Sequence, residues 1–161
     1  MASAAHVLHV GDGSFHRASV LRFAGYTVDE CETLHELAAW FREGRTTDVV
    51  CISEEPDRAA EGAIALVRSK SVAPVVLFRS TERPYLQRGV ELEFPALTQP
   101  DVWLRELSRL IAMTRATLER SAELRASSAQ LRAESEAVRR RTQELREQIA
   151  FRREEEEQSG K

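Results

Sequence analysis

The first hundred residues alternate short apolar runs with stretches in which apolar residues recur every three or four positions. Short apolar runs are typical of buried strands, and the wider spacing is typical of helices with one buried face. The pattern predicts strands at residues 6–10, 26–31, 48–53, 74–78 and 90–94. It predicts helices at residues 14–24, 33–43 and 58–70, and one or two helical turns at 82–89. We therefore expect an α/β fold with right-handed crossovers, a parallel sheet and helices on both of its faces.

After Pro100 the pattern changes to a repeat of seven residues, and residues 101–159 contain neither glycine nor proline. A sustained heptad repeat indicates a coiled coil. A helix from residue 101 to about 157 is too long to be stable without a partner along its apolar seam. We assign to the dimer seam Leu107, Leu110, Leu124, Leu131, Val138, Leu145 and Ile149.

Composition places a domain boundary at residue 112. All five prolines lie in the first 100 residues, and six of the seven glycines lie before residue 90. The sequence thus predicts a domain at 1–112, a coiled coil at 113–157 that continues its last helix, and a disordered tail at 158–161. The net charge of −3 argues against nucleic acid as a partner.

Cys31 and Cys51 lie in apolar runs, which predicts buried free thiols in a reducing compartment. No window reaches the length of apolar sequence that a membrane span needs, and the first residues lack the pattern of a signal peptide. We expect a cytoplasmic protein without a membrane span. The spacing of histidine and cysteine predicts no metal site and no cofactor.

Residues 5–112 resemble the receiver domain of response regulators. Val7-Leu-His-Val-Gly-Asp12 is similar to the strand that ends in the family's acidic pair, and residues 48–53 are similar to the strand that carries the phosphoacceptor aspartate. Residues 74–81 resemble the strand that ends in the switch Ser/Thr, and residues 94–100 resemble the Lys-Pro turn before the last helix. The resemblance implies a flavodoxin-like, doubly wound sheet of five parallel strands in the order 2-1-3-4-5. It also implies a role in bacterial two-component signal transduction.

The chemistry of the resembling site is degenerate. Gly11 stands where the family has its first acidic residue, which leaves Asp12 alone, and the acceptor position falls on Ser53 or, one residue later, Glu54. The lysine position is Pro95 or Gln99. The switch hydroxyl is Ser80 or Thr81, and Arg79 beside it is a candidate to neutralise Asp12 or Glu54. Phosphoryl transfer needs a carboxylate nucleophile, bound Mg²⁺ and a cation.

These departures predict a pseudo-receiver that is not an enzyme and is not phosphorylated by the usual route. The residues of its degenerate pocket are Asp12, Ser53, Glu54, Arg79, Ser80, Thr81 and Gln99. Two alternatives remain open. One is an atypical response regulator that is still phosphorylated near Ser53 or Glu54, and the other is a flavodoxin-like module that binds a small ligand.

For the long helix we expect a parallel homodimer that serves as the output of a signalling or scaffold protein. Most a positions of the heptad are Ser or Thr, so the seam buries little area and the dimer is of marginal stability. Arginines occupy the neighbouring e positions (Arg125, Arg132, Arg139, Arg146 and Arg153). A heteromeric partner helix with acidic flanks is the alternative that would satisfy these arginines.

Overall fold

The computed structural model describes residues 4–13, 16–54, 60–80 and 89–159. Strands and helices alternate in the order that the sequence predicts. The elements are β1 (His6–Val10), α1 (Arg17–Phe23), β2 (Thr27–Cys31), α2 (Leu34–Arg42), β3 (Val49–Ser53), α3 (Glu61–Lys70), β4 (Val75–Arg79), β5 (Leu92–Pro95) and α4 (Pro100–Ser159).

The five strands form one parallel sheet in the order β2-β1-β3-β4-β5. This confirms the predicted flavodoxin-like architecture. The central strand β3 is buried along its whole length, as expected for an apolar run covered on both faces. Because all strands run in the same direction, their carboxyl ends meet at one edge of the sheet, where such folds place their sites.

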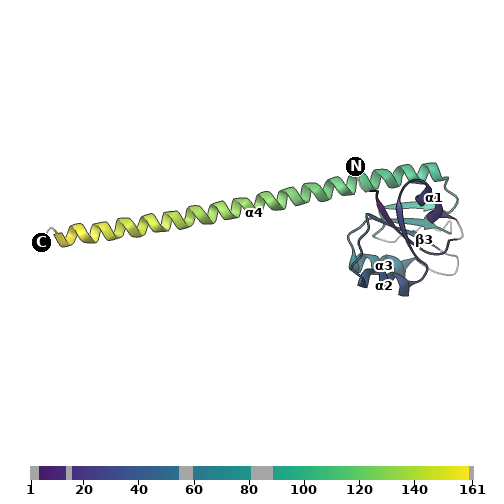
Figure 1. Cartoon of the computed structure of the whole chain (residues 1–161), viewed down its shortest axis with the longest axis horizontal. Coiled ribbons are helices and arrows are strands. Elements are labelled where there is room, and N and C mark those ends of the chain that lie inside the picture. The colour runs from purple at the N-terminus through teal and green to yellow at the C-terminus, as the bar shows by residue number, and fades with distance from the viewer. Residues whose placement is uncertain (1–3, 14–15, 55–59, 81–88, 160–161) are drawn as a thin grey trace. The chain divides into compact units, whose positions relative to one another are not determined.

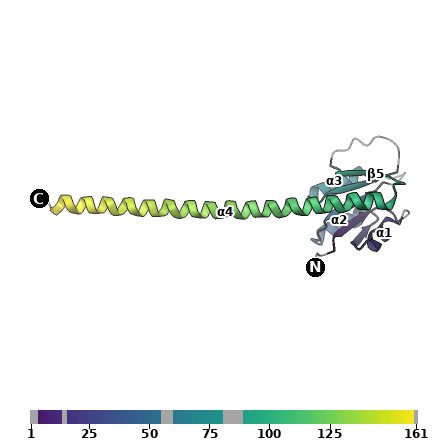
Figure 2. The same ribbon diagram turned by 90° about the horizontal axis from the view of Figure 1, so that it is seen from above.

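Two hydrophobic clusters cover the two faces of the sheet. One packs α2 and α3 against alternate residues of β1, β3 and β4, with Leu37 and Ile64 at its centre. The other packs α1 and the first turns of α4 against the opposite face, where Trp103 meets the Phe78 ring edge-on at 5.4 Å. Figure 1 shows α2 and α3 on one side of the sheet, and Figure 2 shows the first turns of α4 lying over the other.

The element boundaries differ from the predicted ones by a few residues. The described part of α1 begins at Arg17, after His16 in a left-handed conformation with φ of 51°. Strand β5 begins at Leu92 rather than at residue 90. Ser14, the expected start of the first helix, and nearly all of the turns expected at 82–89 lie outside the described residues.

The chain forms two compact units, Met1–Arg115 and Ala116–Lys161. The first unit, which we call the head, ends beyond the expected boundary at residue 112. Its last residue, Arg115, donates from Nε and Nη2 to the Asp48 carboxylate, each at 2.8 Å. This bidentate pair holds one further turn of α4 against the head.

The seam assignment needs a correction at its start. Leu107 is 1% exposed in the core of the head, and Leu110 packs against the same cluster. Leu107 is therefore not part of an exposed seam, whereas Leu110 is only partly buried and stays a predicted seam residue. The seam residues of the second unit are half-exposed or more: Leu124, Leu131, Val138, Leu145 and Ile149. In the part of the chain that the structure describes, no helix combines the length and apolarity needed to cross a bilayer.

Candidate functional site

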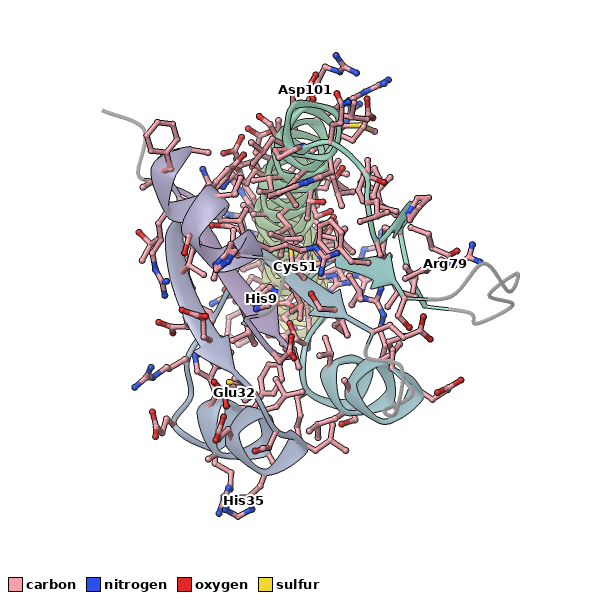
Figure 3. All side chains as sticks on the ribbon, turned by 90° about the vertical axis from the view of Figure 1, so that its right-hand side faces the viewer. His9, Glu32, His35, Cys51, Arg79 and Asp101 are labelled. Atoms are coloured by element: carbon pink, nitrogen blue, oxygen red, sulfur yellow. The ribbon has the colours of Figure 1, made fainter. Side chains whose placement is uncertain are left out.

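Three of the predicted site positions lie where parallel strands end. Ser53 is the last residue of β3, Arg79 is the last residue of β4 and Ser80 follows it. Gly11 follows β1, and its backbone N–H donates to the Cys31 carbonyl of the neighbouring β2 at 2.9 Å. The sheet therefore brings these segments together at its carboxyl edge. Figure 3 shows His9 and Cys51 in the interior of the head and Arg79 at its periphery.

Ser53, the residue at the expected acceptor position, is held by two side chains. It is 7% exposed. Its Oγ accepts a hydrogen bond from Arg17 Nη1 at 2.9 Å and lies 3.1 Å from His9 Nε2. A hydroxyl with two such partners is oriented and shielded from water. The end of β3 is therefore occupied by a closed hydrogen-bonded cluster of His9, Arg17 and Ser53, which we call the Ser53 cluster.

Arg17 is one of two residues of this cluster that the sequence did not predict. Its guanidinium carbon lies 4.3 Å from the centre of the Phe78 ring, and its Nη2 donates to the Ala96 carbonyl at 2.9 Å. Burial lowers its pKa to about 10, so it stays charged at neutral pH. Arg17 thereby links α1 to the end of β3 and to the segment after β5. The only sequence signal was an arginine in the first turn after the β1 loop, which is equally typical of an exposed helix.

His9 is the second unpredicted member of the cluster. It is 1% exposed, and burial lowers its pKa to about 4. A neutral imidazole suits this place, because an imidazolium would lie beside the charged Arg17. Its Nδ1 has no hydrogen-bond partner among the described residues. The buried thiol of Cys51, from the same face of the sheet, has its pKa raised to about 12 by burial and is unreactive.

Gly11 allows the ends of β1 and β3 to approach each other closely. Its φ is +121°, a conformation that residues with a side chain rarely adopt. A Cβ atom at this position would lie 2.8 Å from the backbone oxygen of Ser53, which is closer than real contacts allow. The backbones of the β1 and β3 ends therefore lie too close together at this point to accommodate a side chain on residue 11. This geometry disfavours any residue but glycine.

Glu54 makes local contacts at the same edge. Its backbone N–H donates to the Phe78 carbonyl at 2.8 Å, and its carboxylate accepts from the Ser80 N–H at 3.1 Å. Arg79, for which the sequence suggested Asp12 or Glu54 as a partner, has Nη1 3.7 Å from Glu93. The Glu54 carboxylate thus links the ends of β3 and β4.

The remaining predicted positions are less central. Asp12 and Gln99 are exposed, and the Gln99 carbonyl accepts from the Val102 and Trp103 N–H groups at the start of α4. The Ser80 Oγ is buried without a hydrogen-bond partner in the described ranges, and Thr81 lies outside them. Within those ranges, no three His, Cys, Asp or Glu side chains gather in a way that could hold a metal ion.

The comparisons with known proteins support the fold. No protein-family model matches the sequence, and no curated protein matches it. Among solved structures, the chain is similar to a fusion protein that carries residues 181–211 of the yeast Spc42 trimeric coiled coil. The TM-score is 0.65 at 17% identity, over 86% of this chain and 99% of that one.

Two further similar structures are receiver-type proteins. One is the N-terminal domain of a response regulator/sensory box/GGDEF protein from Carboxydothermus hydrogenoformans, with a TM-score of 0.60 and 17% identity, over 70% of this chain and 98% of that one. The other is the chemotaxis protein CheY4 of Vibrio cholerae, with a TM-score of 0.57 and 21% identity, over 67% and 99%. At these identities the similarity shows that the head has the receiver fold.

Proposed function

We propose that this chain is a non-catalytic signalling or scaffold protein, in which a receiver-like head recognises a partner and the helical second unit joins two copies. The head has the receiver fold, and its sequence has Gly11 at the first acidic position and Ser53 or Glu54 at the acceptor position. In this proposal its conformation is set by side chains of its own, and phosphorylation by the usual route does not switch it.

The observation that carries the proposal is the hydrogen bond from the Arg17 guanidinium to Ser53 Oγ at 2.9 Å. Phosphoryl transfer to a receiver needs a carboxylate nucleophile, together with Mg²⁺ and a cation that neutralise the transferred group. Here a fixed cation already lies at the end of β3, and its second nitrogen holds the segment after β5 through Ala96. Arg17 therefore joins the end of β3 to the segment after β5 without a phosphoryl group.

The second unit supports an output by association. Along it, four large apolar residues at heptad spacing are 50–65% exposed: Leu124, Leu131, Val138 and Leu145. A helix with such a row gains stability by burying it against another helix. We propose a homodimer as the associated form, with a heteromeric acidic helix as the competing occupant. The arginines at the e positions are the feature that favours this second occupant.

Phosphorylation provides the direct test of the head. The full chain is incubated with acetyl phosphate and Mg²⁺ beside a receiver domain that has an intact acidic site, and the intact mass of each is measured. We expect a phosphoryl adduct on the control receiver and an unchanged mass for this chain. An adduct on this chain that is lost in Ser53→Ala or Glu54→Gln would overturn the proposal in favour of an atypical, phosphorylated regulator.

A further inference from the structure

The exposed seam of the second unit has large residues in one row and small residues in the other. Its d positions hold Leu or Val from residue 124 to 145. Its a positions are small and polar before Ile149: Ser121, Ser128, Ser135 and Thr142. The structure makes this asymmetry matter, because Leu107, the one leucine at an a position, is buried in the head and cannot contribute to the seam.

We propose that a second copy of the chain packs on this seam in the antiparallel direction, which revises the parallel arrangement expected from the sequence. The proposal rests on the proposed self-association and specifies its geometry. In an antiparallel pair each a position faces a d position of the other copy. A register in which the two residue numbers of a layer sum to 273 pairs Thr142 with Leu131, Ser135 with Val138 and Ser128 with Leu145.

Packing is the physical reason for this choice. Large residues opposite small ones fill each layer evenly, whereas equal residues opposite each other leave gaps between the small ones. A parallel pair would alternate layers of two leucines with layers of two serines, and the serine layers would bury hydroxyls with little contact. In the antiparallel register Ile149 also faces Leu124, so every exposed apolar residue of the seam is covered.

Charge does not favour the parallel pair. In either direction each chain makes one contact between opposite charges and two between arginines, and exposed contacts of this kind contribute less than about 1 kcal/mol each. The favourable contact in the antiparallel pair joins Glu134 to Arg141 of the second copy. We choose the register with a sum of 273 because it places these two residues opposite each other. The arginine contacts are Arg120–Arg125 and Arg141–Arg146 in the parallel pair, and Arg125–Arg146 and Arg132–Arg139 in the antiparallel one.

The arrangement has a consequence for function. The two copies of Arg115, the last residue of each head, would lie at opposite ends of the paired segment, about 65 Å apart at 1.5 Å per residue. The heads would then bind two separate partners and would not act on each other. A parallel pair would instead bring the two copies of Arg115 together. The inferred role is that of a bridge between two binding sites.

Disulfide trapping in the full chain distinguishes the two directions. Two variants, Ser128→Cys and Leu145→Cys, are mixed and oxidised. One of them is ¹⁵N-labelled, so that the mass of a disulfide-linked dimer shows which two chains it contains. The masses are measured without reductant. The native Cys31 and Cys51 are buried and have raised pKa values, so they do not compete. We expect the mixed disulfide to dominate, because residues 128 and 145 share a layer. The matched control mixes Ser121→Cys with Leu145→Cys, one heptad out of register, and should give little product.

Each other outcome has a defined meaning. A disulfide between two Ser128→Cys chains, formed in preference to the mixed one, would overturn the antiparallel pair and leave self-association intact. Equal yields from the matched control would overturn the register. Light scattering of the unmodified chain separates these results from a failure of the proposed function: a monomer at all concentrations would remove self-association itself, and a trimer would exclude the antiparallel pair.

Discussion

At the scale of single residues, the candidate site is defined by the contacts that Arg17 and His9 make with the Ser53 hydroxyl. The site residues predicted from the sequence are mainly acidic and hydroxyl residues at the strand ends. The structure adds a buried guanidinium that bonds Ser53 and packs on the Phe78 ring, and a neutral buried imidazole. Neither could be identified from the sequence, because an arginine in a helix and a histidine in a strand are commonplace until the fold places them together.

Replacement of Gly11 by Ala tests the close approach of the β1 and β3 ends. The added Cβ meets the Ser53 carbonyl at 2.8 Å and the residue must hold φ at +121°. We expect a loss of about 2–4 kcal/mol in the free energy of unfolding, measured by urea denaturation. Gly13→Ala is the matched control, since a Cβ there meets nothing within 4 Å. Equal losses in the two variants would contradict the role given to Gly11.

His9 makes the stability of the head depend on pH. Its folded pKa of about 4 lies below its ordinary value of 6.5, so the unfolded chain binds more protons between these values. The free energy of unfolding should therefore fall as the pH drops from 6.5 to 4, by up to about 3 kcal/mol from this group. His9→Gln should reduce that slope in pH-dependent urea unfolding, whereas the exposed His35→Gln should keep it.

At the scale of elements, α4 is a single helix whose residues have two different surroundings. Its first turns bury Trp103, Leu107 and Ile111 against the sheet, and its later turns expose their apolar row. The surroundings change near Arg115, whose bidentate pair with Asp48 is the last side-chain contact between α4 and the head described above. The hydrogen bonds from Arg115 hold the pKa of the Asp48 carboxyl below its ordinary value.

Asp48→Asn tests this contact. Loss of the charge-assisted pair should lower the free energy of unfolding of the head by about 1–3 kcal/mol and speed amide hydrogen exchange in α4 around residues 107–115. Because the Asp48 pKa is depressed, the stabilisation should be present at neutral pH and disappear as the pH falls through that pKa. Glu43→Gln, in the exposed pair with Arg45, is the control and should change little. An unchanged pattern of hydrogen exchange in Asp48→Asn would contradict the role given to the Arg115–Asp48 pair.

At the scale of the whole molecule, we propose a head that phosphorylation does not switch, followed by a helix that pairs with a second copy. In the proposed function, the first unit serves recognition and the second serves assembly. If association were lost, the heads would remain folded, because the core of the head includes α4 only as far as Ile111. Assembly and head stability are therefore expected to respond to different substitutions.

The double variant Leu124→Gln with Leu131→Gln tests assembly. Each leucine contributes about 1.5–3 kcal/mol when it is buried, so the dissociation constant of the dimer should rise more than about a hundredfold in sedimentation experiments. The control is Ala126→Gln with Ala133→Gln, on the opposite side of the same turns, which should leave it nearly unchanged. Equal weakening in both variants would show that the seam is not where the chains meet.

The sequence by itself determined the alternation of strands and helices and the long helix, and the strand order followed from the resemblance to receiver domains. Alternating apolar runs and a heptad repeat are local signals that survive without knowledge of contacts. Only the tertiary structure decided that Leu107 belongs to the head and that Arg17 and His9 bind Ser53. It also decided that Gly11 must lack a side chain. The reason is physical: these properties depend on which surfaces meet, and residues far apart in sequence meet only when the sheet is assembled.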